Sequence, residues 1–202
     1  MISTLSKKHS FDAVFDSQKV FRLIIEAMSN PARVVNIKEY ADKFFGGHPV
    51  FLAVAMTLLD NEISFNTCGN QPLSDEIVSL TLAKREQTEF ADFVFVCDPN
   101  EIKNKKNIKS VIEKAKCGTL SDPHKSATVI IRDNRENVPA CRLTLSGPGI
   151  DGYTTVQATQ TIKYAITLRD ARYYEYPQGI DLIFISNDGD LTAIPRTSRM
   201  EA

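Results

Sequence analysis

The sequence lacks the features that mark several large classes of protein. No apolar run approaches the roughly 18–20 residues that a membrane-spanning helix requires, so we expect no membrane partner. The N-terminal stretch MISTLSKKHSFDAVF has no apolar segment like that of a secretory signal, which predicts a cytoplasmic protein. The formal net charge of −1 gives no bulk positive field for nucleic acid. We therefore expect no nucleic-acid partner either.

Cysteine and histidine are too few and too scattered to predict a metal site. The four cysteines are Cys68, Cys97, Cys117 and Cys141, and no two of them form a C-x-x-C pair. Structural zinc sites usually draw their ligands from closely spaced pairs. An isolated cysteine is commonly a small buried residue. We therefore expect no bound metal and no oxidising compartment.

Recognisable catalytic motifs are missing as well. The chain has no G-x-x-x-x-G-K-[ST] phosphate loop and no G-x-G-x-x-G dinucleotide loop. Ser146 in LSGPG lacks the surroundings of a nucleophile elbow, and no histidine nearby in the sequence could serve as its base. We predict no catalytic residue and no cofactor from this chain alone. This absence favours a binding or scaffolding subunit over an autonomous enzyme.

One stretch, residues 179–197, organises the rest of the chain. The run Ile180 to Ile185 is apolar except for Asp181, which is typical of a strand covered on both faces. Asp188-Gly189 fits a two-residue hairpin turn, because such turns favour glycine where φ is positive. Residues 191–194 return as the partner strand, and Pro195 has no N–H to continue the ladder. The pattern predicts a core hairpin that delivers Arg196 and Thr197 to a sheet end.

The remaining elements follow from apolar spacing and from turn signals. We predict helices within residues 16–30, 49–60, 74–85, 103–116 and 160–174. Asp16 or Ser17 would cap the first helix, Ser74 would cap the third, and Gly118 would end the fourth. We predict strands within residues 62–68, 92–97, 127–131, 142–145 and 153–156, with 142–145 pairing with 127–131 across a polar connection at 133–139. Helices alternate with strands early and strands dominate later, which predicts one α/β domain over residues 1–202 with a mixed sheet.

The segment from Lys103 to Lys116 contains six lysines. It could be an anion platform, or a surface helix whose lysines are solvated. The second interpretation is favoured, because the lysines have no interleaved aromatic residues and no glycine-rich loop.

Several blocks in order along the chain resemble the PhnH family. They read FDAVFDSQKVFRLIIEAMSNP, TLLDNEISF, ADFVFV, SATVII, LTLSGPGI, GIDLIF and AIPRT. Two positions depart from the family pattern: Ala32 stands where glycine is usual, and Gln178 where leucine is common. We expect Ala32 to give that loop a different backbone path.

The resemblance implies a fold and a function. The fold would be a three-layer α/β/α sandwich similar to pyridoxal-phosphate-dependent transferases, without that cofactor. The chain would be a subunit of the carbon–phosphorus lyase core complex, which makes ribose 1-methylphosphonate 5-triphosphate from ATP and methylphosphonate and releases adenine. It would form a homodimer alone and otherwise dock on the other core subunits. The alternative is an independent enzyme or binder that acts on a phosphorylated small molecule.

Arg22, Arg196 and Thr197 are the candidate ligand or partner contacts, because they lie in the family-like blocks. Guanidinium groups suit bidentate contacts to phosphate or carboxylate oxygens. The alternative for the arginines is a structural salt bridge, for instance to Asp181 or Glu26. The glycines of the GPGI segment, residues 147–150, pose a similar choice between close approach to a ligand and a tight turn, and the turn is favoured.

Overall fold

The computed structural model describes residues 9–98, 100–133 and 141–201. Within these residues the helices are α1 (Phe15–Ser29), α2 (Lys38–Ala41), α3 (Pro49–Leu58), α4 (Gln71–Thr81), α5 (Glu101–Lys114) and α6 (Gln160–Ala171), with a short 3-10 turn at Pro123–Lys125. The strands are β1 (Val34–Asn36), β2 (Ser64–Asn66), β3 (Lys84–Arg85), β4 (Phe93–Val96), β5 (Thr128–Arg132), β6 (Cys141–Ser146), β7 (Thr154–Ala158), β8 (Asp181–Ile185), β9 (Asp190–Ile194) and β10 (Arg199–Glu201).

The strands form two sheets. The larger has the order β1-β9-β8-β5-β4-β2-β3, parallel from β8 to β3 and antiparallel where β9 joins β8 and β1. The smaller, β10-β6-β7, is antiparallel throughout. The predictions of a mixed sheet and of the β8–β9 hairpin are confirmed. The predicted two-residue turn is wrong, because Ser186 pairs with Asp190 and leaves a loop of three residues, Asn187 to Gly189. The predicted pairing of residues 142–145 with 127–131 is wrong, because β4 and β8 already occupy both edges of β5.

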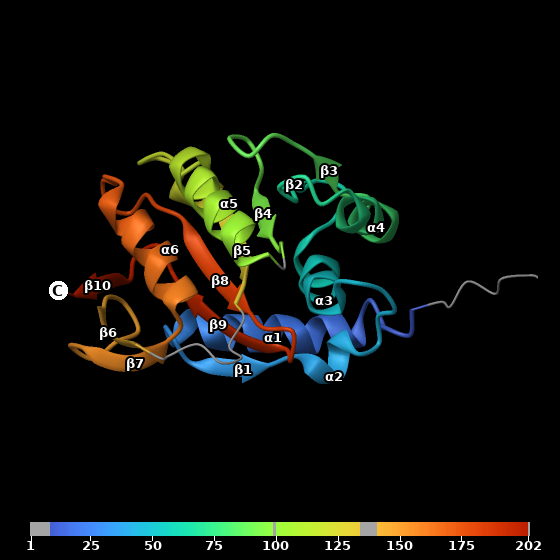
Figure 1. Ribbon diagram of the computed structural model, residues 1–202, viewed down its shortest axis with the longest axis horizontal. Coiled ribbons are helices and arrows are strands. Elements are labelled where there is room, and N and C mark those ends of the chain that lie inside the picture. Colours follow the sequence, from blue (N-terminus) through green and yellow to red (C-terminus); the bar gives the residue numbers. More distant parts are fainter. Residues whose placement is uncertain (1–8, 99, 134–140, 202) are drawn as a thin grey trace, which may run out of the picture.

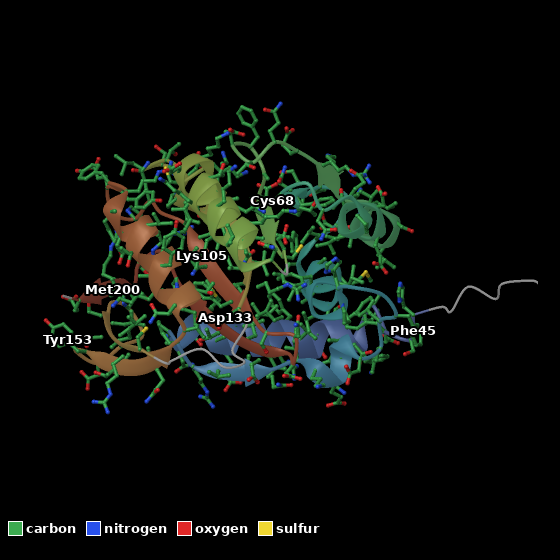
Figure 2. The ribbon with its side chains drawn as sticks, viewed as in Figure 1. Phe45, Cys68, Lys105, Asp133, Tyr153 and Met200 are labelled. Carbon is green, nitrogen blue, oxygen red and sulfur yellow. The ribbon has the colours of Figure 1, made fainter. Side chains whose placement is uncertain are left out.

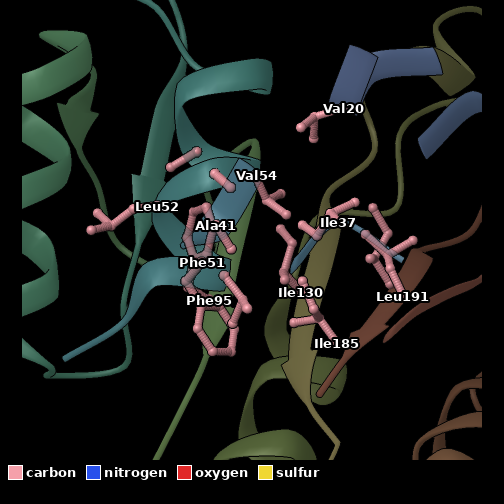
Figure 3. Packing of buried hydrophobic residues seen from close by; sticks show 14 of the residues in the cluster. Val20, Ile37, Ala41, Phe51, Leu52, Val54, Phe95, Ile130, Ile185 and Leu191 are labelled. Carbon is pink, nitrogen blue, oxygen red and sulfur yellow. The ribbon is translucent and has the colours of Figure 1, made fainter. Parts of the chain in front are cut away.

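Helices cover both faces of the larger sheet (Figure 1). Helices α1 to α4 pack on one face and α5 and α6 on the other, so the chain has two buried clusters separated by the sheet. Ile183 and Ile185 of β8 belong to the first cluster, part of which Figure 3 shows, whereas Leu182 and Phe184 belong to the second. Strand side chains alternate between faces, so this division explains why the run is apolar at almost every position.

Two predicted helix caps are wrong. Helix α1 begins at Phe15, and the Asp12 carboxylate accepts the N–H groups of Val14 and Phe15, each at 2.8 Å. Asp16 is instead buried and pairs with the Lys43 ammonium at 2.7 Å. The sequence alone could not show which of Asp12 and Asp16 holds the start of α1, because both aspartates precede the apolar stripe of the helix.

The third helix also starts earlier than predicted. Its cap is Asn70, whose side-chain oxygen accepts the Leu73 N–H at 3.1 Å. Ser74 lies inside the helix, where its hydroxyl accepts from Nε of Arg85 at 2.8 Å. Residues 84 and 85 form the edge strand β3 and not the end of the helix.

Helix α5 buries its apolar stripe at Ile108, Val111, Ile112 and Ala115, as predicted. It ends at Lys114 with Ala115 as C-cap, so the predicted end at Gly118 is wrong. Lys109 and Lys114 are exposed and pair with Glu113 and Glu89 at 3.9 and 3.4 Å. These contacts favour the solvated-face interpretation. No helix in the described part of the chain is both long and apolar enough to cross a membrane.

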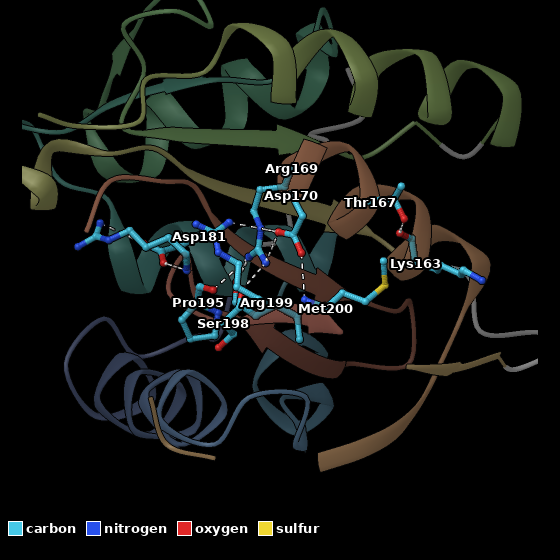
Figure 4. A network of polar contacts seen from close by, with 11 residues as sticks. Lys163, Thr167, Arg169, Asp170, Asp181, Pro195, Ser198, Arg199 and Met200 are labelled. Carbon is cyan, nitrogen blue, oxygen red and sulfur yellow. Dashed lines mark hydrogen bonds and ion pairs between the residues drawn. The ribbon is translucent and has the colours of Figure 1, made fainter. Parts of the chain in front are cut away.

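A buried arginine of α6 ties the helix to the end of the large sheet. Arg169 has no exposed surface and donates to the carbonyls of Ile194, Pro195 and Ser198 at 3.2, 3.1 and 2.6 Å (Figure 4). The adjacent Asp170 carboxylate accepts from Nε of Arg169 at 3.0 Å.

Asp170 extends the same network to β10. Its carboxylate accepts the Met200 N–H at 3.0 Å and lies 3.5 Å from the Arg199 guanidinium. Arg169 and Asp170 therefore fix the segment that leads from the large sheet into the small one.

We predict that Gly189→Ala destabilises the protein by about 2–4 kcal/mol, since it adds left-handed strain to a steric clash. Gly189 has φ +80°, and a Cβ there would lie 2.5 Å from the Lys38 backbone nitrogen. The matched control is Gly152→Ala, at φ +72° with nothing within 4 Å, which should lose only about 1 kcal/mol. Urea unfolding measures both variants, and equal losses would contradict the predicted clash.

We predict that Arg169→Met lowers the free energy of unfolding by about 3–5 kcal/mol, because it strands three buried carbonyls and removes the buried partner of the Asp170 carboxylate. Arg169→Lys should recover only part of the loss, since one ammonium cannot replace the planar guanidinium. Lys163→Met, on the exposed side of the same helix, should stay within about 0.5 kcal/mol of the parent. Denaturant unfolding measures all three variants. If Arg169→Lys restored the full free energy of unfolding, the prediction would be wrong, because the positive charge alone would then account for the stabilisation.

Candidate functional site

The structure places the three predicted contact residues in different surroundings. Arg22 is exposed on α1. Arg196 donates its backbone N–H to Oδ1 of Asp181 at 2.7 Å, and its guanidinium contacts Oδ2 at 3.5 Å and the Ser126 hydroxyl. Arg196 thus makes the salt bridge to Asp181 that the sequence left as the alternative. Thr197 is half-buried, and its carbonyl lies beside Gly147.

Residues 29–31, of sequence SNP, meet the GPGI segment at a shallow hollow of about 450 Å³. Gly149 has φ +83°, and a Cβ there would lie 2.6 Å from the Ser29 carbonyl oxygen. This close approach is to the protein's own backbone, which favours the tight-turn interpretation. Tyr153, 70% exposed, is one of the residues that line the hollow, and it lies at the edge of the molecule in Figure 2.

Ala32 lines the same hollow and has φ +67°. This is the left-handed region that glycine adopts without strain. Ala32 therefore takes a backbone conformation typical of glycine, and the expectation that alanine diverts the loop stays a prediction.

A second hollow lies where the strand order of the large sheet reverses. From β2 the chain proceeds to β3 on one side, whereas from β4 it proceeds to β5 on the other. Ligands of open α/β sheets bind outside the carboxyl ends of the strands at such a switch point. A hollow of about 130 Å³ is found there, lined by Thr67, Cys68, Gly69, Asn70, Cys97, Asp98 and Asn107.

Four polar residues form what we call the switch-point cluster: His48, Asn70, Cys97 and Arg132. Nε of Arg132 donates to the Cys97 carbonyl at 2.9 Å, and Nη2 of Arg132 lies 3.2 Å from Nδ1 of His48. Nδ2 of Asn70 lies 3.1 Å from Nε2 of His48 and 3.3 Å from Sγ of Cys97. Asn70 and Cys97 belong to the wall of the hollow, and His48 and Arg132 lie behind them.

Burial sets the protonation states in and around the cluster. It lowers the pKa of His48, and the neighbouring Arg132 charge lowers that pKa further, so His48 is neutral at pH 7. Burial raises the pKa of Cys97 to about 11 and that of Cys68 to about 12. Burial also lowers the pKa of Arg132, although a guanidinium stays charged at neutral pH.

These states limit the chemistry that the cluster can perform. The thiolate is the reactive form of cysteine, and both thiols are protonated at neutral pH. The described residues also include no group of three His, Cys, Asp or Glu side chains that could hold a metal ion. The cluster offers hydrogen-bond donors and one buried charge, which suits recognition of a ligand better than covalent catalysis.

The sequence alone does not predict this cluster, because its members come from four separate segments. Each residue ends or follows a predicted strand, or begins a helix, and none belongs to a recognised motif. The available signal was positional: Asn70, Cys97 and Arg132 all fall at or just beyond the carboxyl ends of strands.

Comparison with known proteins gives a family and one relative. Residues 9–201 match the model of the family described as bacterial phosphonate metabolism protein PhnH. A protein of Stutzerimonas stutzeri, named as a candidate C-P lyase subunit, HtxG, is 27% identical over 183 residues, which cover 91% of this chain and 85% of that protein. The family match spans nearly the whole chain, as the ordered sequence blocks predicted, and the chain therefore belongs to the PhnH family of bacterial phosphonate metabolism proteins.

Proposed function

We propose that this chain is a non-autonomous subunit of a carbon–phosphorus lyase core complex. The observation that carries the proposal is the family match over residues 9–201, and the likeness to HtxG supports it. The assembled complex would make ribose 1-methylphosphonate 5-triphosphate from ATP and methylphosphonate with release of adenine. The chain's own part in this transferase would be structural or ligand-binding, since the switch-point cluster offers no activated nucleophile.

An exposed apolar surface on α1 supports a docking role. Val14, the N-cap residue of α1, and Phe21 and Ile25 within the helix follow one another at helical spacing and are 70%, 46% and 48% exposed. We call these three residues the α1 face. Arg22 is exposed beside Phe21 and stays a predicted partner contact. Clustered apolar side chains of this kind often mark protein–protein contacts.

The finer expectations from the family resemblance stay predictions. These are a single domain over residues 1–202, likeness to pyridoxal-phosphate-dependent transferases without the cofactor, a homodimer in isolation and a cytoplasmic location. Arg196 and Thr197 also stay predicted contacts. For Arg196, a ligand would have to compete with the contacts to Asp181 and Ser126.

We predict that the chain co-purifies stoichiometrically with the other core subunits when they are co-expressed. The double variant Phe21→Gln, Ile25→Gln should weaken this association at least 30-fold, because removing a central aromatic contact costs about 2 kcal/mol or more. The control is Phe90→Gln, whose parent side chain is 63% exposed but lies outside the α1 face. Affinity purification with sizing gives the result, and circular dichroism verifies folding.

A different outcome would favour the alternative function. If the chain ignores those partners and turns over a phosphorylated small molecule alone, it is an independent enzyme. If the chain associates with the partners but the double variant binds them as tightly as the parent does, the chain is a subunit of the complex and the α1 face is not where the partners bind.

A further inference from the structure

We propose that strand β7 pairs with β7 of a second copy of this chain, antiparallel about a two-fold axis, so that the two small sheets join into one. The inference goes beyond the proposed function, because it concerns the chain alone and does not depend on the other core subunits. It assigns a surface to self-association, which the family resemblance does not. Three features carry it: an open strand edge, the absence of charge on that edge, and a hollow beside it.

The open edge belongs to the small sheet. β7 pairs with β6 over five residues, from Thr154 to Ala158, and no other strand in the described part of the chain pairs with its opposite side. β7 lies at the lower left edge of the molecule in Figure 1. It contains no proline, so each of its residues has both a backbone N–H and a C=O. The groups that point away from β6 are therefore available to pair with another strand.

The other three sheet edges among the described residues are better protected. Folded proteins commonly protect an edge with charged side chains or by keeping the edge strand short. Strand β3 consists of Lys84 and Arg85 alone, and β10 has Arg199 and Glu201 among its three residues. Strand β1 is also three residues long. β7 has five residues, reads TTVQA and carries no charge, so it lacks both kinds of protection.

The two faces of the small sheet restrict how two copies can pair. Val156 and Ala158 pack against the second buried cluster, whereas Thr155 and Gln157 are exposed on the other face. A shift of one residue would turn the buried face of one copy outward. The register with the greatest overlap places Val156 opposite its counterpart and Thr155 opposite Gln157 of the second copy. None of these residues is charged, so the edge does not repel itself.

The hollow of about 450 Å³ adjoins this edge, because Tyr153, Thr154 and Val156 line it. Val156 is only half-buried, and the Tyr153 ring is largely exposed. An added strand would bring a second Val156 and a second Ala158 to the buried face of the sheet, next to Val156 of the first copy. Pairing would thus add burial of apolar surface to the backbone hydrogen bonds. Tyrosine is also enriched in protein–protein interfaces.

The interface is small, because five residues of each copy pair. Stable interfaces usually bury about 1,200–2,000 Å², which is more than two such short strands provide. We therefore expect a dimer that dissociates on dilution. The test is analytical ultracentrifugation of the full chain alone over a dilution series, which should show a monomer–dimer equilibrium. Since no other subunit is present, the outcome is independent of whether the chain belongs to a complex.

Two double variants test the edge and its register. Thr155→Glu with Gln157→Glu should weaken dimerisation at least tenfold, because two pairs of like charges would face each other across the copies. Thr155→Lys with Gln157→Glu should restore dimerisation to within about threefold of the parent, because opposite charges would then face each other. Within one copy, position 157 lies opposite Arg142 of β6 in both variants. The variants therefore differ only in the sign of the charge at position 155.

The control is Thr167→Glu, which adds a charge at an exposed position of α6 and should leave the dissociation constant unchanged. Circular dichroism verifies that each variant folds. Both positions changed on β7 are exposed, so folding of the single copy should be retained.

Three results would overturn the proposal. The first is a chain that stays monomeric at every concentration; if Thr155→Glu with Gln157→Glu then prevented assembly with the core subunits, the edge would take a strand of another protein. The second is a dimer that both double variants leave unchanged, which would place the interface elsewhere. The third is equal weakening by both double variants, which would exclude the antiparallel register.

Discussion

The position of residues 194–201, at the end of the chain, depends on one buried guanidinium. Arg169 gathers the carbonyls of Ile194, Pro195 and Ser198, three groups that leave the β-ladder where Pro195 interrupts it. Its neighbour Asp170 then holds the backbone of β10, which pairs with β6. The family-like AIPRT block therefore has a structural role: its backbone turns from the large sheet to the small one while packed against α6.

The parts of the fold that sequence predicted are those set by local chemistry. The β8–β9 hairpin follows from an apolar run, an Asp-Gly turn and a proline, and each acts within a few residues. The partner of β6 could not be predicted in this way, because strand pairing depends on which edges are free. Strand β5 has none, since β4 and β8 flank it. The caps of α1 and α4 were missed for a similar reason: Asp12, Asp16, Asn70 and Ser74 are all plausible caps, and tertiary contacts of Asp16 and Ser74 decide between them.

The candidate site could not be predicted from local sequence patterns either, because it too depends on tertiary contacts. In the sequence, Arg132 simply follows a predicted β-branched strand, and His48 precedes the proline that starts a predicted helix. Neither position predicts a site. Only the parallel order β5-β4-β2 brings the ends of these segments together. Burial then changes their chemistry, because it keeps the thiols protonated and His48 neutral.

The two buried arginines are held in the fold in different ways. Both have a pKa lowered by burial. Arg169 is matched by three carbonyls and by the Asp170 carboxylate, so its charge and its donors are satisfied within the fold. Arg132 has neutral hydrogen-bond partners, and the charge of the Asp98 carboxylate favours its charged form from a greater distance. Catalysis requires groups that interact more strongly with the transition state than with the substrate, and the cluster contains no activated base or nucleophile for that purpose. The cluster is therefore a set of buried, hydrogen-bonded groups, and the hollow beside it has the Asp98 carboxylate and two protonated thiols in its wall.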